Sequence, residues 1–159
     1  MRKRQGVQSV LALIALLVLT LAVGAGGGMV TAPNVANWYP TLVKPSFNPP
    51  AWLFGPVWTT LYVLMAIAAW RVWRTQGALS RPLLLWLLQL ALNFAWSFIF
   101  FGAHALLAAL IELSILWLAL LATLIAFFRV DRLAGWLLVP YLAWVSFAGV
   151  LNAAIWRLN

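Results

Sequence analysis

The chain has 159 residues, of which 66% are hydrophobic and 8% are charged, and its formal net charge is +8. A water-soluble domain of this length needs far more polar surface, so the composition excludes a soluble globular protein. In lipid every backbone polar group must be bonded within the protein, which leaves helices or a closed barrel. The apolar runs are continuous rather than alternating, and they therefore predict an all-α integral membrane protein.

Five apolar segments, in chain order, are each about 20 residues long, which is enough to cross a hydrocarbon core of about 30 Å. They run over residues 7–30, 56–73, 82–101, 105–128 and 133–156. Proline and glycine mark the breaks between them, as at Gly55-Pro56 and Gly102. We predict a single transmembrane domain over residues 1–159, a five-helix bundle in which residues 31–55 form a lid loop.

The first segment also has features of a cleavable secretory signal. Basic residues at its start are followed by an apolar run and then by the small residues of Gly24-Ala25-Gly26-Gly27-Gly28. The apolar run continues to Val30, which is longer than the core of a usual signal peptide. We therefore expect a retained helix.

The positive charge is distributed unevenly over this topology. Eight of the ten basic residues fall on one side of the membrane, and the other two, Lys44 and Arg157, fall on the opposite side. The eight are Arg2, Lys3, Arg4, Arg71, Arg74, Arg81, Arg129 and Arg132. This asymmetry is typical of the positive-inside rule and of contact with anionic lipid, not of nucleic-acid binding. It predicts a multi-pass protein of a bacterial cell membrane with a cytoplasmic N-terminus.

Ordinary catalytic and metal sites are not expected. The chain has no cysteine, one histidine and two acidic residues, Glu112 and Asp131. These cannot build a metal cage or a pair of catalytic carboxylates, so we predict no metal site. Asp131 lies between Arg129 and Arg132, where a solvated ion pair is the simplest role.

Aromatic and polar residues share helix faces in three of the predicted spans. Trp58 and Tyr62 lie one turn apart in the second span. The third carries Trp86, Gln89, Asn93, Trp96 and Phe100, and the fifth carries Trp136, Pro140, Trp144 and Ala148 at steps of four. Most tryptophans in such a protein are interfacial anchors or packing residues. Trp58, Trp96 and Trp144 face polar neighbours at greater depth, and for these we predict the lining of a pocket.

Two further residues each have two readings. Glu112 lies at the depth of Asn93, and it is either a structural carboxyl bonded to Asn93 or Ser114 or a functional group, because ionisable residues within spans are commonly functional. His104 lies in a turn at the interface. It is either a solvated turn residue or a ligand for an anionic group or a haem iron.

Three separated motifs strongly resemble the translocator protein family, also called tryptophan-rich sensory protein or peripheral benzodiazepine receptor. The similarity covers residues 38–159. The motifs are Trp38-Tyr39 with Lys44-Pro45, Phe47, Pro49-Pro50, Phe54, Trp58 and Leu61-Tyr62; Gln89, Asn93 and Trp96; and Trp136, Pro140-Tyr141 and Trp144 with Leu151-Asn152.

The resemblance implies a five-helix bundle, commonly a homodimer, with a ligand pocket under the loop between the first two helices. Family members bind porphyrins such as protoporphyrin IX and haem as ligands, and no cofactor is required. By position the pocket residues are Tyr39, Pro49, Phe54, Trp58, Tyr62, Asn93, Trp96, Trp144 and Ala148. Trp58 and Trp144 match two tryptophans linked to light-dependent porphyrin breakdown in bacterial relatives, which makes them candidate catalytic residues.

The loop fits a lid over such a pocket. Its prolines stiffen the backbone and lack N–H donors, and Trp38, Tyr39, Phe47, Trp52 and Phe54 offer an apolar underside. The acid groups of a porphyrin are expected near Lys44, His104 or water. Phe47 stands where many relatives have tryptophan, and no tyrosine precedes Arg157 as the cholesterol motif of animal relatives requires.

The sequence thus favours a membrane receptor or sensor for tetrapyrroles that acts in porphyrin handling, transport or stress regulation. The alternatives are a light-dependent catalyst of porphyrin degradation and a non-catalytic membrane scaffold or transporter.

Overall fold

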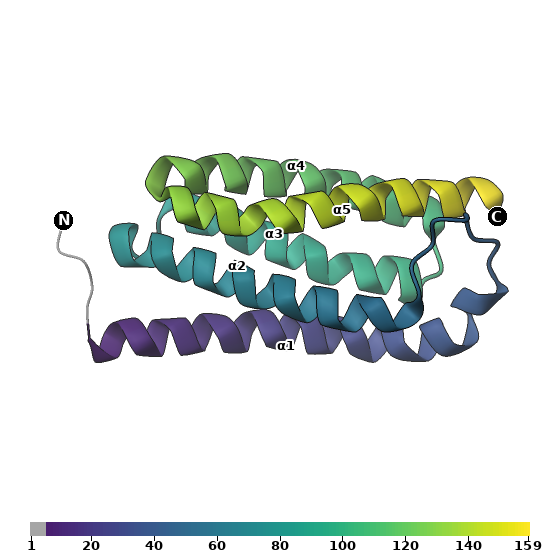
Figure 1. Cartoon of the computed structure of the whole chain (residues 1–159), viewed down its shortest axis with the longest axis horizontal. Coiled ribbons are helices and arrows are strands. Elements are labelled where there is room, and N and C mark those ends of the chain that lie inside the picture. The colour runs from purple at the N-terminus through teal and green to yellow at the C-terminus, as the bar shows by residue number, and fades with distance from the viewer. Residues whose placement is uncertain (1–5) are drawn as a thin grey trace.

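The computed structural model describes residues 6–159, which form five long helices and, within that range, no strand. The helices are α1 Val7–Asn37, α2 Phe54–Gln76, α3 Arg81–Ser97, α4 Leu106–Val130 and α5 Arg132–Leu158. All five are long and apolar enough to cross a membrane. The all-α class is confirmed, and an integral multi-pass membrane protein is what these helices support (Figure 1).

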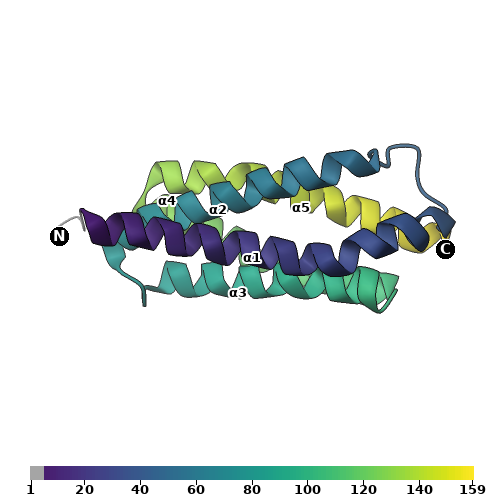
Figure 2. The same ribbon diagram turned by 90° about the horizontal axis from the view of Figure 1, so that it is seen from below.

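The helices pack as a ring around a shared interior. α1 packs against α2 and α3, α5 packs against α2 and α4, and α3 packs against α4, which gives the order α1, α2, α5, α4, α3 around the bundle. Figures 1 and 2 show the five helices nearly parallel to one long axis, with α1 along one side of the bundle. Lipid-side positions of α1 are large and apolar, as at Val10, Leu11 and Ile14.

Helix α1 is longer than the sequence predicts, because it continues past Val30 and through Pro33 to end at Asn37. A proline removes one N–H from the helical ladder, here the partner of the Met29 carbonyl, and two side chains add bonds to carbonyls on either side of that position. Thr31 Oγ1 donates to the Gly27 carbonyl at 2.8 Å, and Asn34 Nδ2 donates to the Val30 carbonyl at 2.8 Å. The connection between α1 and α2 therefore spans residues 38–53 and is shorter than the lid predicted over residues 31–55.

The third span ends in a short π-helix, η3 Phe98–Gly102. The Ala103 N–H donates to the Phe98 carbonyl at 2.8 Å, which is the five-residue spacing of this rare helix type. The wider turn leaves the consecutive residues Phe100 and Phe101 both buried. The sequence predicts a helix to Phe101 and a tight turn after it, but not this change of ladder.

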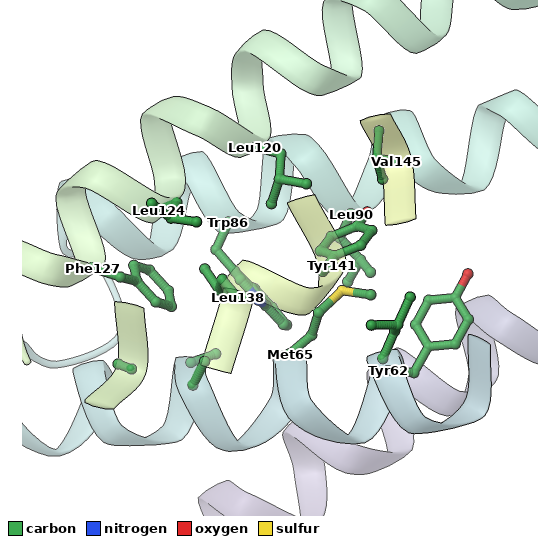
Figure 3. Packing of buried hydrophobic residues seen from close by; sticks show 14 of the residues in the cluster. Tyr62, Met65, Trp86, Leu90, Leu120, Leu124, Phe127, Leu138, Tyr141 and Val145 are labelled. Atoms are coloured by element: carbon green, nitrogen blue, oxygen red, sulfur yellow. The ribbon is translucent and has the colours of Figure 1, made fainter. Parts of the chain in front are cut away.

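The core between α2, α3, α4 and α5 is filled by large apolar side chains, and Figure 3 shows Met65, Trp86, Leu138 and Tyr141 packed together. Trp86 is only 1% exposed, so it is a packing residue of the core and not an anchor at the membrane interface. Between helices in lipid, close packing and hydrogen bonds supply the attraction that the hydrophobic effect supplies in water.

Asp131 joins the turn between α4 and α5 to α2. Its Oδ1 accepts hydrogen bonds from the N–H groups of Leu133 and Ala134 at 2.9 and 3.1 Å, which caps α5. Its Oδ2 lies 2.7 Å from Nη2 of Arg71, so its ion pair is with α2 and not with the sequence neighbours Arg129 and Arg132. Burial raises the pKa of Asp131, but the hydrogen bonds and charge of Arg71 with the capping N–H groups outweigh burial and hold the pKa below its usual range.

We expect Asp131→Ala, which removes the cap and the ion pair, to lower the free energy of unfolding by about 1–3 kcal/mol. Asp131→Asn keeps an oxygen for the cap and should cost at most about 1 kcal/mol. Because the folded-state pKa is depressed, the ionic contribution is complete above the unfolded pKa of about 3.9 and is lost as the pH falls through the folded pKa. Thermal unfolding of both proteins in detergent across this pH range measures the ionic contribution. A difference in stability between wild type and Asp131→Asn that does not change with pH would contradict the ion pair.

Candidate functional site

A cavity of about 620 Å³ lies inside the half of the bundle next to the α1–α2 connection. This is within the range of small-molecule pockets, roughly 300–1,000 Å³. The structure brings eight of the nine predicted pocket residues to its wall: Tyr39, Phe54, Trp58, Tyr62, Asn93, Trp96, Trp144 and Ala148. Pro49 is not part of the wall. Ligand binding by these residues stays a prediction, but their gathering around one space is now a property of the fold.

Helix α1 supplies a wall of small residues that the sequence does not assign to the pocket. Gly24, Ala25, Gly27 and Gly28 all line the cavity. From the sequence, Gly24 to Gly28 are interpreted only as a signal-peptide cleavage site or as part of a retained helix. A Cβ atom at Gly24 would lie 2.7 Å from the Tyr62 ring, so glycine is required for the close approach of α1 and α2 at that point.

The cavity opens to the surface between α1 and α2. Several wall residues are also exposed, namely Ala25, Gly28 and Ala32 on α1 and Gly55 and Thr59 on α2. Figure 2 shows α2 leaning away from α1 toward the end where Phe54 begins the helix. Since these positions lie on membrane-spanning helices, the opening faces the lipid phase.

Three side chains form a hydrogen-bonded chain beside the cavity, on the side away from the connection. The Tyr62 hydroxyl donates to Asn93 Oδ1 at 2.6 Å, and Asn93 Nδ2 donates to the Tyr141 hydroxyl at 2.7 Å. The chain joins α2, α3 and α5, and all three residues are buried. Hydrogen bonds between membrane helices contribute about 0.6–2 kcal/mol each.

A second set of bonds ties the loop side of the cavity wall. Trp96 Nε1 donates to Asn152 Oδ1 at 3.3 Å, and Asn152 Nδ2 donates to the Leu106 carbonyl at 3.0 Å. Trp96 also stacks on Phe100, with ring centroids 4.9 Å apart. Asn93 and Trp96, which the sequence places on one face of α3, therefore both form hydrogen bonds to neighbouring helices.

Trp58 and Trp144 stand on the α2 and α5 sides of the cavity. The Trp58 ring centroid lies 5.7 Å from that of Tyr62 and 6.2 Å from that of Tyr141. The Trp144 ring lies edge-on to Phe54 at 6.0 Å, and its Nε1 has no hydrogen-bond partner among the described residues. With Trp96, they surround the space with three indoles, as the sequence predicts.

The predicted stripe of α5 does not face one direction. Each step of four residues advances about 40° around a helix, since one residue turns about 100°. Trp136 and Pro140 are therefore exposed, whereas Trp144 and Ala148 reach the cavity wall. The first two of these four residues thus face out of the bundle, and the last two face the cavity.

The connection that covers the loop end is held by its own polar groups. The Tyr39 hydroxyl donates to Asn48 Oδ1 at 2.6 Å, and burial raises the pKa of Tyr39 to about 12. The C-terminal residue Asn159 bonds the backbone of Val43, accepting from its N–H at 3.0 Å and donating to its carbonyl at 2.9 Å. No sequence signal predicts this tie between the connection and α5.

Lys44 is committed to the connection itself. Its Nζ donates to the carbonyls of Tyr39 at 3.0 Å and Leu42 at 2.8 Å and lies 5.2 Å from the Tyr39 ring centroid. These contacts orient the ammonium group without neutralising its charge, so the expectation that acid groups of a ligand lie near Lys44 stays a prediction. The ammonium group also stabilises the turn that places Tyr39 in the wall.

The aromatic underside predicted for the lid is reduced to two residues. Of the five predicted there, Tyr39 and Phe54 line the cavity. Trp52 is 72% exposed and Phe47 is 47% exposed, so both contribute mainly to the outer surface. Trp38 packs edge-on to Phe100 with ring centroids 5.7 Å apart, outside the wall.

Neither Glu112 nor His104 lies in the cavity wall. Both carboxyl oxygens of Glu112 are buried without a hydrogen-bond partner in residues 6–159, so the predicted bonds to Asn93 or Ser114 are not made. His104 has φ of 55°, stacks on Trp38 with centroids 3.9 Å apart, and places Nε2 2.9 Å from Asn34 Oδ1. It is thus a structured turn residue that joins the α3–α4 turn to α1.

We expect Gly24→Ala to destabilise the protein by about 1–3 kcal/mol, because its Cβ forces the Tyr62 ring away from α1 and strains the bond to Asn93. Gly28→Ala is the matched control, since its Cβ meets nothing within 4 Å. Thermal unfolding of both variants in one detergent measures the difference. Equal melting temperatures would mean that Tyr62 moves without cost.

The model of the TspO/MBR family matches residues 15–157. Tryptophan-rich protein TspO of Chlorobaculum tepidum is 46% identical over 156 residues, 96% of this chain and 98% of that protein. Protein CrtK of Rhodobacter capsulatus is 42% identical over 154 residues, 94% of each chain. The translocator protein of Homo sapiens is 46% identical over 127 residues, 77% of this chain and 75% of that protein. These matches extend over the five helices and the aromatic cavity, and the chain belongs to the TspO/MBR family.

Proposed function

We propose that this membrane protein binds a tetrapyrrole, protoporphyrin IX or haem, in the cavity between its helices and acts as a receptor or sensor for it. The observation that carries the proposal is the gathering of Trp58, Trp96 and Trp144 around a single space of about 620 Å³. A porphyrin is a flat aromatic disc, and indole rings offer both apolar area and stacking to such a ligand.

The shape of the wall supports a flat ligand. The α1 side is formed mainly by glycine and alanine, with larger side chains only at Leu21, Thr31 and Val35, whereas the opposite sides carry aromatic rings. A disc can lie along the smooth side and meet the rings with its other face. Its acid groups would extend toward the connection, where Lys44 keeps its positive charge, and toward water.

The chemistry of the wall favours a metal-free porphyrin over haem. No described residue that lines the cavity is histidine, cysteine or methionine, the usual axial ligands of haem iron. The hydroxyls of Tyr39 and Tyr62 donate to Asn48 and Asn93, so neither is poised to ligate iron. We therefore propose that protoporphyrin IX binds more tightly than haem.

The orientation follows from charge. Of the six arginines in residues 6–159, five belong to the end of the bundle opposite the α1–α2 connection, namely Arg71, Arg74, Arg81, Arg129 and Arg132, and Arg157 lies at the other end (Figure 1). By the positive-inside rule we propose that this end is cytoplasmic in a bacterial cell membrane, with the N-terminus on that side. Arg2, Lys3 and Arg4, which contribute to the sequence argument, lie outside the described residues.

We expect Trp144→Ala to weaken protoporphyrin IX binding about tenfold, because it removes one aromatic wall. Trp136→Ala is the control, since Trp136 is on the same helix, is 58% exposed and lies outside the wall. Titration of the detergent-purified variants, followed by porphyrin absorbance and tryptophan quenching, measures both affinities. Identical curves for the two variants, or no saturable binding to the wild type, would refute the proposal.

A light-dependent reaction is a second candidate, favoured by the position of Trp58 between the cavity and the rings of Tyr62 and Tyr141. A light-excited porphyrin would take one electron from the Trp58 indole and pass it to molecular oxygen, which leaves an indole radical cation and superoxide. Further reaction of the reduced oxygen with the macrocycle would then break down the porphyrin.

We expect Trp58→Phe to slow the light-driven loss of the porphyrin Soret band at least several-fold while binding changes little, because phenylalanine keeps an aromatic wall but is far harder to oxidise. Illumination of the porphyrin complex with and without oxygen measures the rate. A rate equal to that of the wild type would exclude Trp58 as the electron donor.

A further inference from the structure

A small polar cleft lies at the arginine-rich end of the bundle, far from the cavity. It has a volume of about 50 Å³ and is lined by Arg71, Arg74, Thr75 and Asp131. One water needs roughly 10–15 Å³ of such space, and pockets for organic ligands start near 300 Å³. The cleft therefore suits a group of a few heavy atoms.

The charges of the cleft do not cancel. Both oxygens of Asp131 are engaged, one by the cap of α5 and the other by Arg71 at 2.7 Å. The guanidinium of Arg74 has no anionic partner within residues 6–159. Thr75 is neutral, and its hydroxyl donates to the Val72 carbonyl at 2.9 Å. Among the described residues, two arginines and one aspartate thus leave the cleft with a net positive charge.

Arg74 is held in position rather than free in solvent. Its guanidinium carbon lies 4.7 Å from the centroid of the Trp70 ring. Trp70 is in turn anchored to α1, because its Nε1 donates to the Ser9 carbonyl at 2.9 Å and lies 3.1 Å from Ser9 Oγ. Stacking on an indole orders the planar guanidinium, so less side-chain freedom is lost when an anion binds.

The two arginines also retain unused donors. The Nε atoms of Arg71 and Arg74 are buried, and neither has a hydrogen-bond acceptor in the described part of the chain. Residues three apart on a helix share a face, so both guanidinium groups reach the same side of α2. An oxyanion with several oxygens is the group that satisfies adjacent guanidinium donors best.

The position of the cleft indicates where that oxyanion comes from. Arg74 lies in the last turn of α2, which ends at Gln76, and Leu79 in the following turn is 89% exposed. The end of a membrane-spanning helix lies at the level of the lipid headgroups. We propose that Arg74, together with Arg71, binds the phosphate group of an anionic phospholipid in this cleft.

Retention of dioleoylphosphatidylglycerol by the full-length protein, measured by native mass spectrometry after titration in detergent, tests the proposal. We expect Arg74→Gln to weaken one lipid-binding step about tenfold, the loss of one charge-assisted hydrogen bond. Arg81→Gln is the matched control, because it removes the same charge from an exposed position at the same end and outside the cleft. Thermal unfolding of each variant verifies that the fold is intact.

Retention that falls equally in both variants would show a general charge effect and overturn the site. Competition by millimolar inorganic phosphate that removes the lipid would assign the cleft to free anions, which also overturns the lipid proposal. Equal retention of zwitterionic dioleoylphosphatidylcholine would do the same. Selective loss of phosphatidylglycerol in Arg74→Gln, without competition by phosphate, supports it, and none of these outcomes depends on porphyrin binding.

Discussion

The hydrocarbon core of a membrane leaves no water to satisfy a backbone amide, so each spanning segment must bond its own N–H and carbonyl groups in a helix. The backbone therefore cannot join one helix to another, and side chains must do so. In this protein Asn93 has that role at the centre of the bundle. It accepts from Tyr62 on α2 and donates to Tyr141 on α5, and these bonds hold the walls of the cavity at a set distance.

The cavity exists because small and large residues are divided between its sides. Close helix packing in lipid normally uses small residues to bring backbones together. Here Gly24 does so against Tyr62, but Gly28, one turn further along α1, meets no side chain. As α1 and α2 diverge, the same glycine-rich stretch changes from a packing surface to the smooth wall of a pocket, and the opening between the two helices faces lipid.

The two ends of the bundle use their polar groups differently. At the loop end, Lys44 and Asn159 bond backbone groups of the connection, so their polarity stabilises the cover of the cavity. At the other end, Asp131 caps α5 and pairs with Arg71, which leaves the charge of Arg74 available. At both ends, polar side chains therefore order the chain by bonding backbone groups or one another.

The sequence by itself determined the helical class and the five spans, because hydropathy is a local property that survives in the folded state, and the family resemblance supplied other aromatic members of the wall beside Trp58, Trp96 and Trp144. It did not predict the continuation of α1 through Pro33 to Asn37, because a proline in a helical pattern normally ends or kinks the helix. Only the tertiary structure decided that Trp136, predicted on one face with Trp144, faces outward, and that the glycines of α1 line a pocket. Those outcomes depend on where a neighbouring helix lies, and the distance between two helices is not written in the spacing of either one.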